Sequence, residues 1–148
     1  MKRKVLLLVL VLFLISILAG CESHFLDGEP EWMRAEDTVY QYWQAIINRQ
    51  YELAKYYCIV DGVWYNKTDE WEEYINVNSG GDASLMIYGP SFYEQTEVIE
   101  NNAVVYAKIT VDKIVFPSKK GIGIDIDVFE YETELFKQDH PPGDWELK

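Results

Sequence analysis

The sequence contains few of the residues on which catalytic and metal sites usually depend. Its 148 residues include two cysteines and two histidines, and neither histidine has a Cys or His nearby at a metal-ligand spacing. The Gly121-Ile122-Gly123 segment lacks the third glycine and the following helix of a dinucleotide-binding loop. We therefore expect no cofactor, no metal and no catalytic residue that a motif can identify.

Positive charge is also scarce. The chain has 13 lysines and arginines against 25 aspartates and glutamates, and its net charge is −12. Removal of residues 1–20 would take away three positive charges and leave the remainder at −15. A surface of this sign repels nucleic-acid phosphates and anionic lipid headgroups. We expect no nucleic-acid partner, and a domain that stands away from the membrane surface.

The longest hydrophobic run lies at the N-terminus. Residues 2–4 are basic, and an apolar stretch follows that is shorter than the roughly 20 residues of a spanning helix. The segment Leu18-Ala19-Gly20-Cys21 resembles the lipobox of bacterial lipoproteins. The resemblance implies cleavage before Cys21 and a diacylglyceryl group on that residue. We expect this lipid to hold the protein on the extracytoplasmic face of the cell membrane; the alternative is an uncleaved signal anchor.

The rest of the chain is long enough for one domain with its own core. We expect a signal peptide over 1–20, an acidic tether over 21–34 and a single domain over 35–148. If Cys21 is lipidated, Cys58 has no cysteine with which to form a disulfide within the chain. We interpret Cys58 as a small buried hydrophobe, with a reactive thiol as the alternative.

Apolar residues first recur at a helical spacing. The spacing predicts a helix that begins near residue 36, an interruption at 48–50 and a short second helix over 51–58. Thr68 is predicted to begin a third helix that runs through Ile75. The predicted buried stripe of the first helix consists of Val39, Tyr40, Trp43, Ile46 and Ile47.

From residue 83 the apolar period changes to two. Strands are predicted over 85–88, 93–100, 103–115 and 121–137, with a last strand that contains Trp145 and Leu147. The apolar positions of 121–137 change from even to odd numbers near residue 128, which predicts a β-bulge at that point. Helices followed by antiparallel strands predict an α+β domain with N-terminal helices packed on a curved antiparallel sheet.

This layout resembles the NTF2-like, cystatin-type cone fold, and in particular small bacterial lipoproteins of the DUF4878 kind. The resemblance rests on segments 38–46 and 51–57, which match the opening helices, and on segments 135–139 and 145–147, which match the closing hairpin. Residues 60–81 match poorly. The resemblance implies the cone fold, which hosts enzymes, binding modules and assembly domains alike and therefore does not decide the function.

Two groups of residues are candidates for a site. Four aromatic residues in the poorly matched segment could line a pocket or a partner surface, or could simply pack in the core. Two aspartates of the 121–137 strand could point into the cone and act as a base if they are buried, or could lie on a solvated face. The aromatic candidates are Trp64, Tyr65, Trp71 and Tyr74, and the carboxylate candidates are Asp125 and Asp127.

Three functions remain open from the sequence. The first is a noncatalytic module of the cell envelope that binds a small ligand or an envelope protein, and we favour it. The second is an NTF2-like pocket enzyme, a hydrolase or isomerase, that uses a buried carboxylate. The third is a structural spacer in an envelope complex, which a filled cone with an exposed apolar patch would favour.

Overall fold

Three helices come before the sheet in the computed structural model, which describes residues 29–81, 83–116, 122–138 and 145–148. α2 (Glu31–Ile47) begins directly after Pro30, whose carbonyl accepts hydrogen bonds from the amides of Met33 and Arg34. The helix therefore begins four residues before the predicted domain boundary, within the stretch predicted as a tether. Cys21 and the rest of the N-terminal segment through residue 28 lie outside the described residues.

α3 (Tyr51–Tyr56) and α4 (Val63–Asn78) complete the helical layer. α4 begins five residues before the predicted start at Thr68, whose hydroxyl is buried inside the helix and donates to the Trp64 carbonyl at 3.0 Å. Gly62 precedes α4 at a point where the chain is crowded, since a Cβ there would lie 2.9 Å from the carbonyl oxygen of Ile59. Only glycine fits this approach without a shift of the backbone.

The sheet is antiparallel throughout, with the order β1-β3-β4-β5, and β2 also pairs with β3. Its strands are β1 (Ala83–Phe92), β2 (Glu97–Ile99), β3 (Asn102–Val115), β4 (Gly123–Lys137) and β5 (Trp145–Leu147). β1 continues through Gly89-Pro90, where the prediction ended it, and its register against β3 shifts there. β5 also connects to the helical layer, because the Ile59 amide donates to the Leu147 carbonyl at 2.8 Å.

The predicted β-bulge near residue 128 is wrong. β3 and β4 pair without interruption from Asn102–Phe136 to Val115–Gly123. The apolar positions of β4 change phase because the surroundings of the strand change along its length. Odd-numbered residues of β4 face the helices throughout, but only one half of the strand is covered by them.

That covered half contains the core. Alternate residues of β3 are buried from Ala103 to Ile109, and the burial continues to Val111 at the start of the other half. α2 packs across the sheet with contacts to four of its strands. Tyr42 replaces Tyr40 in the predicted stripe, because Tyr40 is 42% exposed while Tyr42 is fully buried. The largest fully buried side chains are Trp43, Trp145, Tyr42, Ile46, Ile75, Ile109, Leu135 and Leu147.

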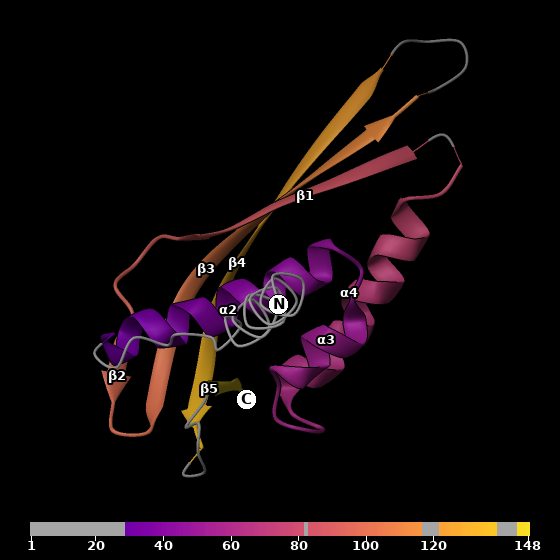
Figure 1. Ribbon diagram of the computed structural model, residues 1–148. Helices are drawn as coiled ribbons and strands as arrows, with labels where there is room; N and C mark the ends of the chain where they lie inside the picture. The colour runs from indigo at the N-terminus through magenta and orange to yellow at the C-terminus, as the bar shows by residue number, and fades with distance from the viewer. Residues whose placement is uncertain (1–28, 82, 117–121, 139–144) are drawn as a thin grey trace, which may run out of the picture.

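Figure 1 shows that the other ends of β1, β3 and β4 extend past α2 and α3. We call residues 83–88, 110–115 and 123–128 the projecting half of the sheet, and residues 102–109 and 129–137 the covered half. Together, the helices and the curled antiparallel sheet confirm the predicted α+β fold of the NTF2-like cone type. The projecting half, however, reaches beyond α2 and α3 (Figure 1) and contacts the helical layer through α4.

Candidate functional site

The four aromatic candidates lie at two different depths. Trp64 and Trp71 are 5% and 4% exposed, and their rings stand edge-on to the ring of Trp43, with centroids 6.1 and 5.3 Å away. These rings fill the space under the covered half. Tyr65 and Tyr74 are half-buried at the edge of this cluster, so a partner surface in this region can be formed by the tyrosines but not by the two indoles.

The two candidate aspartates are exposed. Both lie on the helix side of β4 in the projecting half, since Asp127 pairs with the buried Val111 and Asp125 is two residues away. Asp127 accepts a hydrogen bond from the Tyr74 hydroxyl at 3.4 Å. The enzyme alternative requires a buried carboxylate, and these two residues do not provide one.

Burial and the neighbouring Asp127 carboxylate raise the pKa of Tyr74. Lys113 lies opposite Asp125 across the sheet, but its ammonium donates to Asn78 at 2.7 Å. The contacts near these aspartates therefore connect the end of α4 to the sheet.

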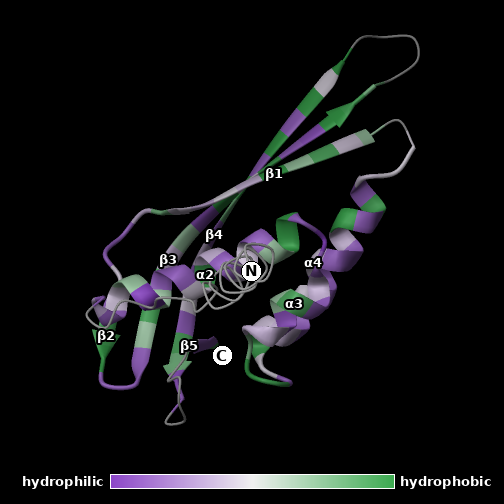
Figure 2. Ribbon diagram, viewed as in Figure 1, coloured by the Kyte–Doolittle hydropathy of each residue, from purple (hydrophilic) through white to green (hydrophobic). Residues whose placement is uncertain are grey.

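The outer face of the projecting half carries a row of exposed aliphatic side chains. Ile124, Ile126 and Val128 are 64%, 60% and 53% exposed, and Ile122, directly before β4, is 68% exposed. We call these four residues the aliphatic stripe. Figure 2 shows the hydrophobic bands along this end of β4. On β3, which pairs with β4, the same face carries Thr110, Asp112 and Ile114. Beyond them, β1 carries Met86 and Tyr88, 41% and 46% exposed. Single exposed apolar residues are ordinary on a surface, but a contiguous set is not.

The sequence carries the signal for this stripe, because apolar residues occupy every even position from 122 to 128. The prediction of a bulge treats this alternation as a buried face, on the assumption that apolar alternation marks the core. The pairing of β3 with β4 shows the opposite arrangement, since Asp125 and Asp127 occupy the side that faces the helices and the aliphatic residues face away from them.

A cavity of about 370 Å³ lies between α2, α3 and β5, away from all six candidate residues. Its lining mixes a guanidinium, two carboxylates and aromatic rings, but neither histidine nor cysteine. The lining residues are Arg34, Asp37, Thr38, Gln41, Tyr56, Tyr57, Trp145 and Glu146. This combination could hold a small polar or cyclic ligand, but it contains no pairing of a nucleophile with a base.

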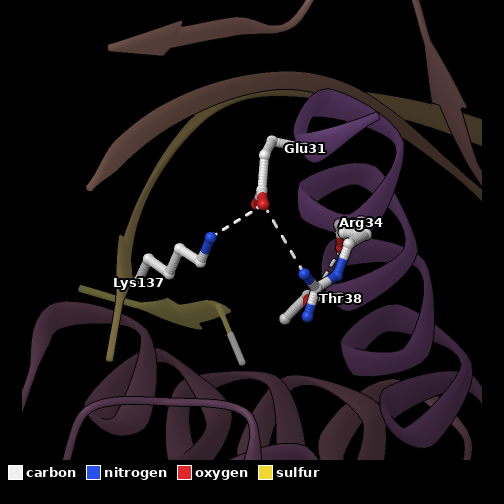
Figure 3. A network of polar contacts seen from close by, with 4 residues as sticks. All are labelled: Glu31, Arg34, Thr38 and Lys137. Atoms are coloured by element: carbon white, nitrogen blue, oxygen red, sulfur yellow. Dashed lines mark hydrogen bonds and ion pairs between the residues drawn. The ribbon is translucent and has the colours of Figure 1, made fainter. Parts of the chain in front are cut away.

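A polar network holds the start of α2 against the end of β4 beside this cavity (Figure 3). The Glu31 carboxylate accepts a hydrogen bond from the Lys137 ammonium at 2.7 Å and lies 3.6 Å from the Arg34 guanidinium. The Lys137 hydrogen bond, opposed by partial burial, lowers the pKa of Glu31. Thr38 joins the network by donating to the Arg34 carbonyl at 3.1 Å. We interpret this network as structural.

Cys58 is buried, as predicted, and its thiol contacts the Ala54 carbonyl at 3.5 Å. Burial raises the pKa of this thiol to about 12, so it stays protonated and unreactive near neutral pH. Across residues 29–81, 83–116, 122–138 and 145–148, no three His, Cys, Asp or Glu side chains are grouped as metal ligands. Within the same ranges, no helix has both the length and the apolarity needed to span a bilayer.

Solved structures share the fold at low sequence identity. The intermembrane space region of the chloroplast protein ARC6 superposes with a TM-score of 0.52 at 12% identity, over 82% of this chain and 95% of that one. A single-residue variant of Rv3472, a protein of unknown function from Mycobacterium tuberculosis, gives 0.50 at 15% identity, over 78% of this chain and 66% of that one. No protein-family model and no curated protein sequence matches the chain. At these identities the likeness concerns the fold alone.

Proposed function

We propose that the protein is a lipid-anchored, extracytoplasmic module of the cell envelope that binds another protein and has no catalytic activity. The anchor is Cys21, for which the support is the lipobox-like segment 18–21. Within this proposal the chain is one of the small lipoproteins of the DUF4878 kind. The partner binds to the projecting half of the sheet.

The observation that carries this proposal is the aliphatic stripe. Three alternate outward-facing side chains of β4, together with Ile122 directly before the strand, are more than half exposed. Contiguous apolar surface of this kind loses water when a partner covers it, and on soluble domains it marks interaction sites. The space beneath the covered half is filled by aromatic rings, which favours an external partner over a ligand held inside the cone.

A filled cone with an exposed apolar patch also favours the structural spacer. Both functions need a partner on the stripe, but they differ in how long it stays. A spacer is a permanent subunit, so the partner remains bound in constant proportion through purification in high salt. A binding module exchanges its partner, and washing with salt releases it.

Site-specific photo-crosslinking in intact cells tests the proposed surface. A photoreactive amino acid at position 126 should give a protein-sized adduct, because Ile126 lies in the centre of the stripe. The matched control is position 132 on the same strand, where Glu132 is also exposed but belongs to the polar outer face of the covered half. Adducts at both positions, or at neither, would contradict the proposal.

Two further measurements test the anchor and the aromatic candidates. Mass spectrometry of the mature N-terminus should show a lipid-modified Cys21, and a peptide that begins before Cys21 would contradict it. Replacement of Trp64 and Trp71 with alanine should reduce stability, since both indoles lie in the core. A weakened partner contact in those variants would follow from unfolding and would not identify a surface.

A further inference from the structure

β4 has a free edge beside the aliphatic stripe. β5 pairs with β4 only at Leu135–Lys137, and the Lys148 amide donates to the Glu134 carbonyl, so in the part of the chain that the structure describes no strand lies along the outer edge from Gly123 to Thr133. An open edge presents unpaired backbone N–H and C=O groups, which readily accept an additional strand. Prolines and bulges commonly block such edges, but β4 contains no proline and keeps a regular register with β3.

The two faces of this edge differ in chemistry. Ile124, Ile126 and Val128 are exposed on the outer face, and Asp125 and Asp127 are exposed on the other. Neither aspartate forms an ion pair with any of the described residues. Lys113 lies opposite Asp125 on that face, but its ammonium donates to Asn78. Six consecutive residues therefore offer an apolar row on one side and two carboxylates outside any ion pair on the other.

This alternation disfavours a second copy of the chain as the occupant. An antiparallel pairing that continues the apolar row places even-numbered residues opposite even-numbered ones. Asp125 and Asp127 then lie opposite themselves or each other, with Cβ atoms about 5 Å apart. Like charges at that separation destabilise the pair, and two strongly acidic chains repel each other as a whole.

The same alternation disfavours a lipid bilayer. The stripe cannot enter the hydrocarbon without bringing Asp125 and Asp127 with it, because they occupy the same six residues. Ionised carboxylates are costly in the membrane core. Anionic headgroups also repel a chain of this net charge.

We propose that the edge of β4 from Gly123 to Val128 binds a strand of the partner protein in which aliphatic residues alternate with lysine or arginine. The aliphatic side chains of the partner strand extend the apolar row of β4, and its lysine or arginine side chains lie beside Asp125 and Asp127. The paired segment is about six residues and roughly 20 Å long. This inference rests on the proposed protein-binding function and adds the chemistry and conformation of the partner segment.

Binding of labelled synthetic peptides to the chain isolated from membranes, held in phosphatidylcholine nanodiscs, tests the inference. The probe is an eight-residue peptide of alternating lysine and valine, and fluorescence anisotropy reports its dissociation constant. The control peptides alternate glutamate and valine, or carry the lysine–valine sequence with every backbone nitrogen methylated. Saturable binding is expected only for the unmodified lysine–valine peptide, and the dissociation constant should rise with NaCl.

Variants locate the site. D125N/D127N should weaken binding of the lysine–valine peptide about fivefold, because two partly exposed ion pairs are lost. The matched control E52Q/E97Q removes two exposed carboxylates from α3 and β2 and should change binding little. The charge-reversed variant D125K/D127K should bind the glutamate–valine peptide and no longer the lysine–valine peptide. A variant with a damaged fold would bind neither.

Several outcomes would overturn the inference. For the peptides, they are equal binding of the lysine–valine and glutamate–valine sequences, binding of the methylated peptide, or no effect of D125N/D127N on binding. For the occupant of the edge, they are a dimer of the chain paired through β4, or transfer of a photo-label from position 126 to lipid. If the inference fails while position 126 still crosslinks to a protein in cells, the partner binds in another way and the proposed function stands. Loss of that cellular adduct would remove the proposed function as well.

Discussion

β3 and β4 run through both the covered and the projecting half of the sheet, and along β4 the two halves differ in which face is apolar. In the covered half, β4 turns Thr133 and Leu135 toward the helices and Glu130 toward solvent. In the projecting half the same helix-side positions carry aspartates, and the solvent side carries the aliphatic stripe. A regular register connects the two halves. The comparison shows that one strand can serve the core along part of its length and a partner along the rest.

The largest expected effect is the loss of the ring at the centre of the covered half. Trp43→Ala should lower the free energy of unfolding by about 3–5 kcal/mol, because the fully buried indole packs against Trp71 and Tyr131. Urea denaturation measures the change. Trp43→Phe should cost less, since the indole nitrogen is buried with no hydrogen-bond partner among the described residues. Equal losses for the two variants would contradict the packing account.

Alanine substitutions of two isoleucines, one in each half, test directly whether the two halves differ in burial. Ile109→Ala should cost about 2–5 kcal/mol, because Ile109 is fully buried in the covered half. Ile126→Ala should cost under about 1 kcal/mol, because Ile126 is 60% exposed and only strand propensity is lost. Equal destabilisation in urea would mean that the projecting half has a core of its own.

Alkaline pH should destabilise the whole domain. Burial raises the pKa of Cys58 from 9.0 to about 12, so the thiol stays neutral in the folded chain where it ionises in the unfolded one. The unfolded state then binds fewer protons, and stability falls as pH rises from about 9 to about 12. Burial of Tyr131, whose pKa is raised from 10.0 to about 12, adds to the loss above pH 10.

Urea midpoints measured across this pH range check the sign. Cys58→Ala should reduce the slope between pH 9 and 10, and Ile126→Ala should leave it unchanged. A midpoint that rises with pH in this range would contradict the assignment of a buried neutral thiol.

The smallest expected effect belongs to the Glu31 network. Glu31→Gln should cost about 0.5 kcal/mol at neutral pH and low salt, because the side chain is 42% exposed and water screens the ion pair with Lys137. The lowered pKa of Glu31 means that this contribution is present above about pH 4.5 and is lost as pH falls below it. Glu132→Gln is the exposed control, and an equal loss in both variants at neutral pH would show that the network contributes nothing.

Periodicity predicted the covered half well because there it reports burial. The strand over 103–115 and the closing strand with Trp145 and Leu147 were predicted from spacing alone, and both are confirmed. The helix stripe was wrong at Tyr40, since the sequence does not show which side of a wide apolar stripe faces the sheet. These elements pack against one core, and the spacing of their apolar residues follows from which side chains face it.

The projecting half could not be predicted in this way. A change of phase in an apolar alternation has two physical causes, a slip of the backbone or a change of surroundings, and the sequence alone does not separate them. The predicted bulge rested on a slip of the backbone, but the regular pairing of β3 with β4 shows that the surroundings of the strand change instead. The depth of the aromatic candidates was open for a related reason, because tryptophans such as Trp64 and Trp71 suit a pocket and a core equally well, and the structure places these two in the core.

Hydrogen–deuterium exchange tests most directly whether a partner covers the projecting half. The measurement compares amides 123–128 in native membranes and in the chain purified into nanodiscs, with amides 129–137 as the internal reference. We predict slower exchange at 123–128 in native membranes and no difference at 129–137, because the partner strand hydrogen-bonds the free edge. Equal exchange of 123–128 in the two preparations would contradict the account.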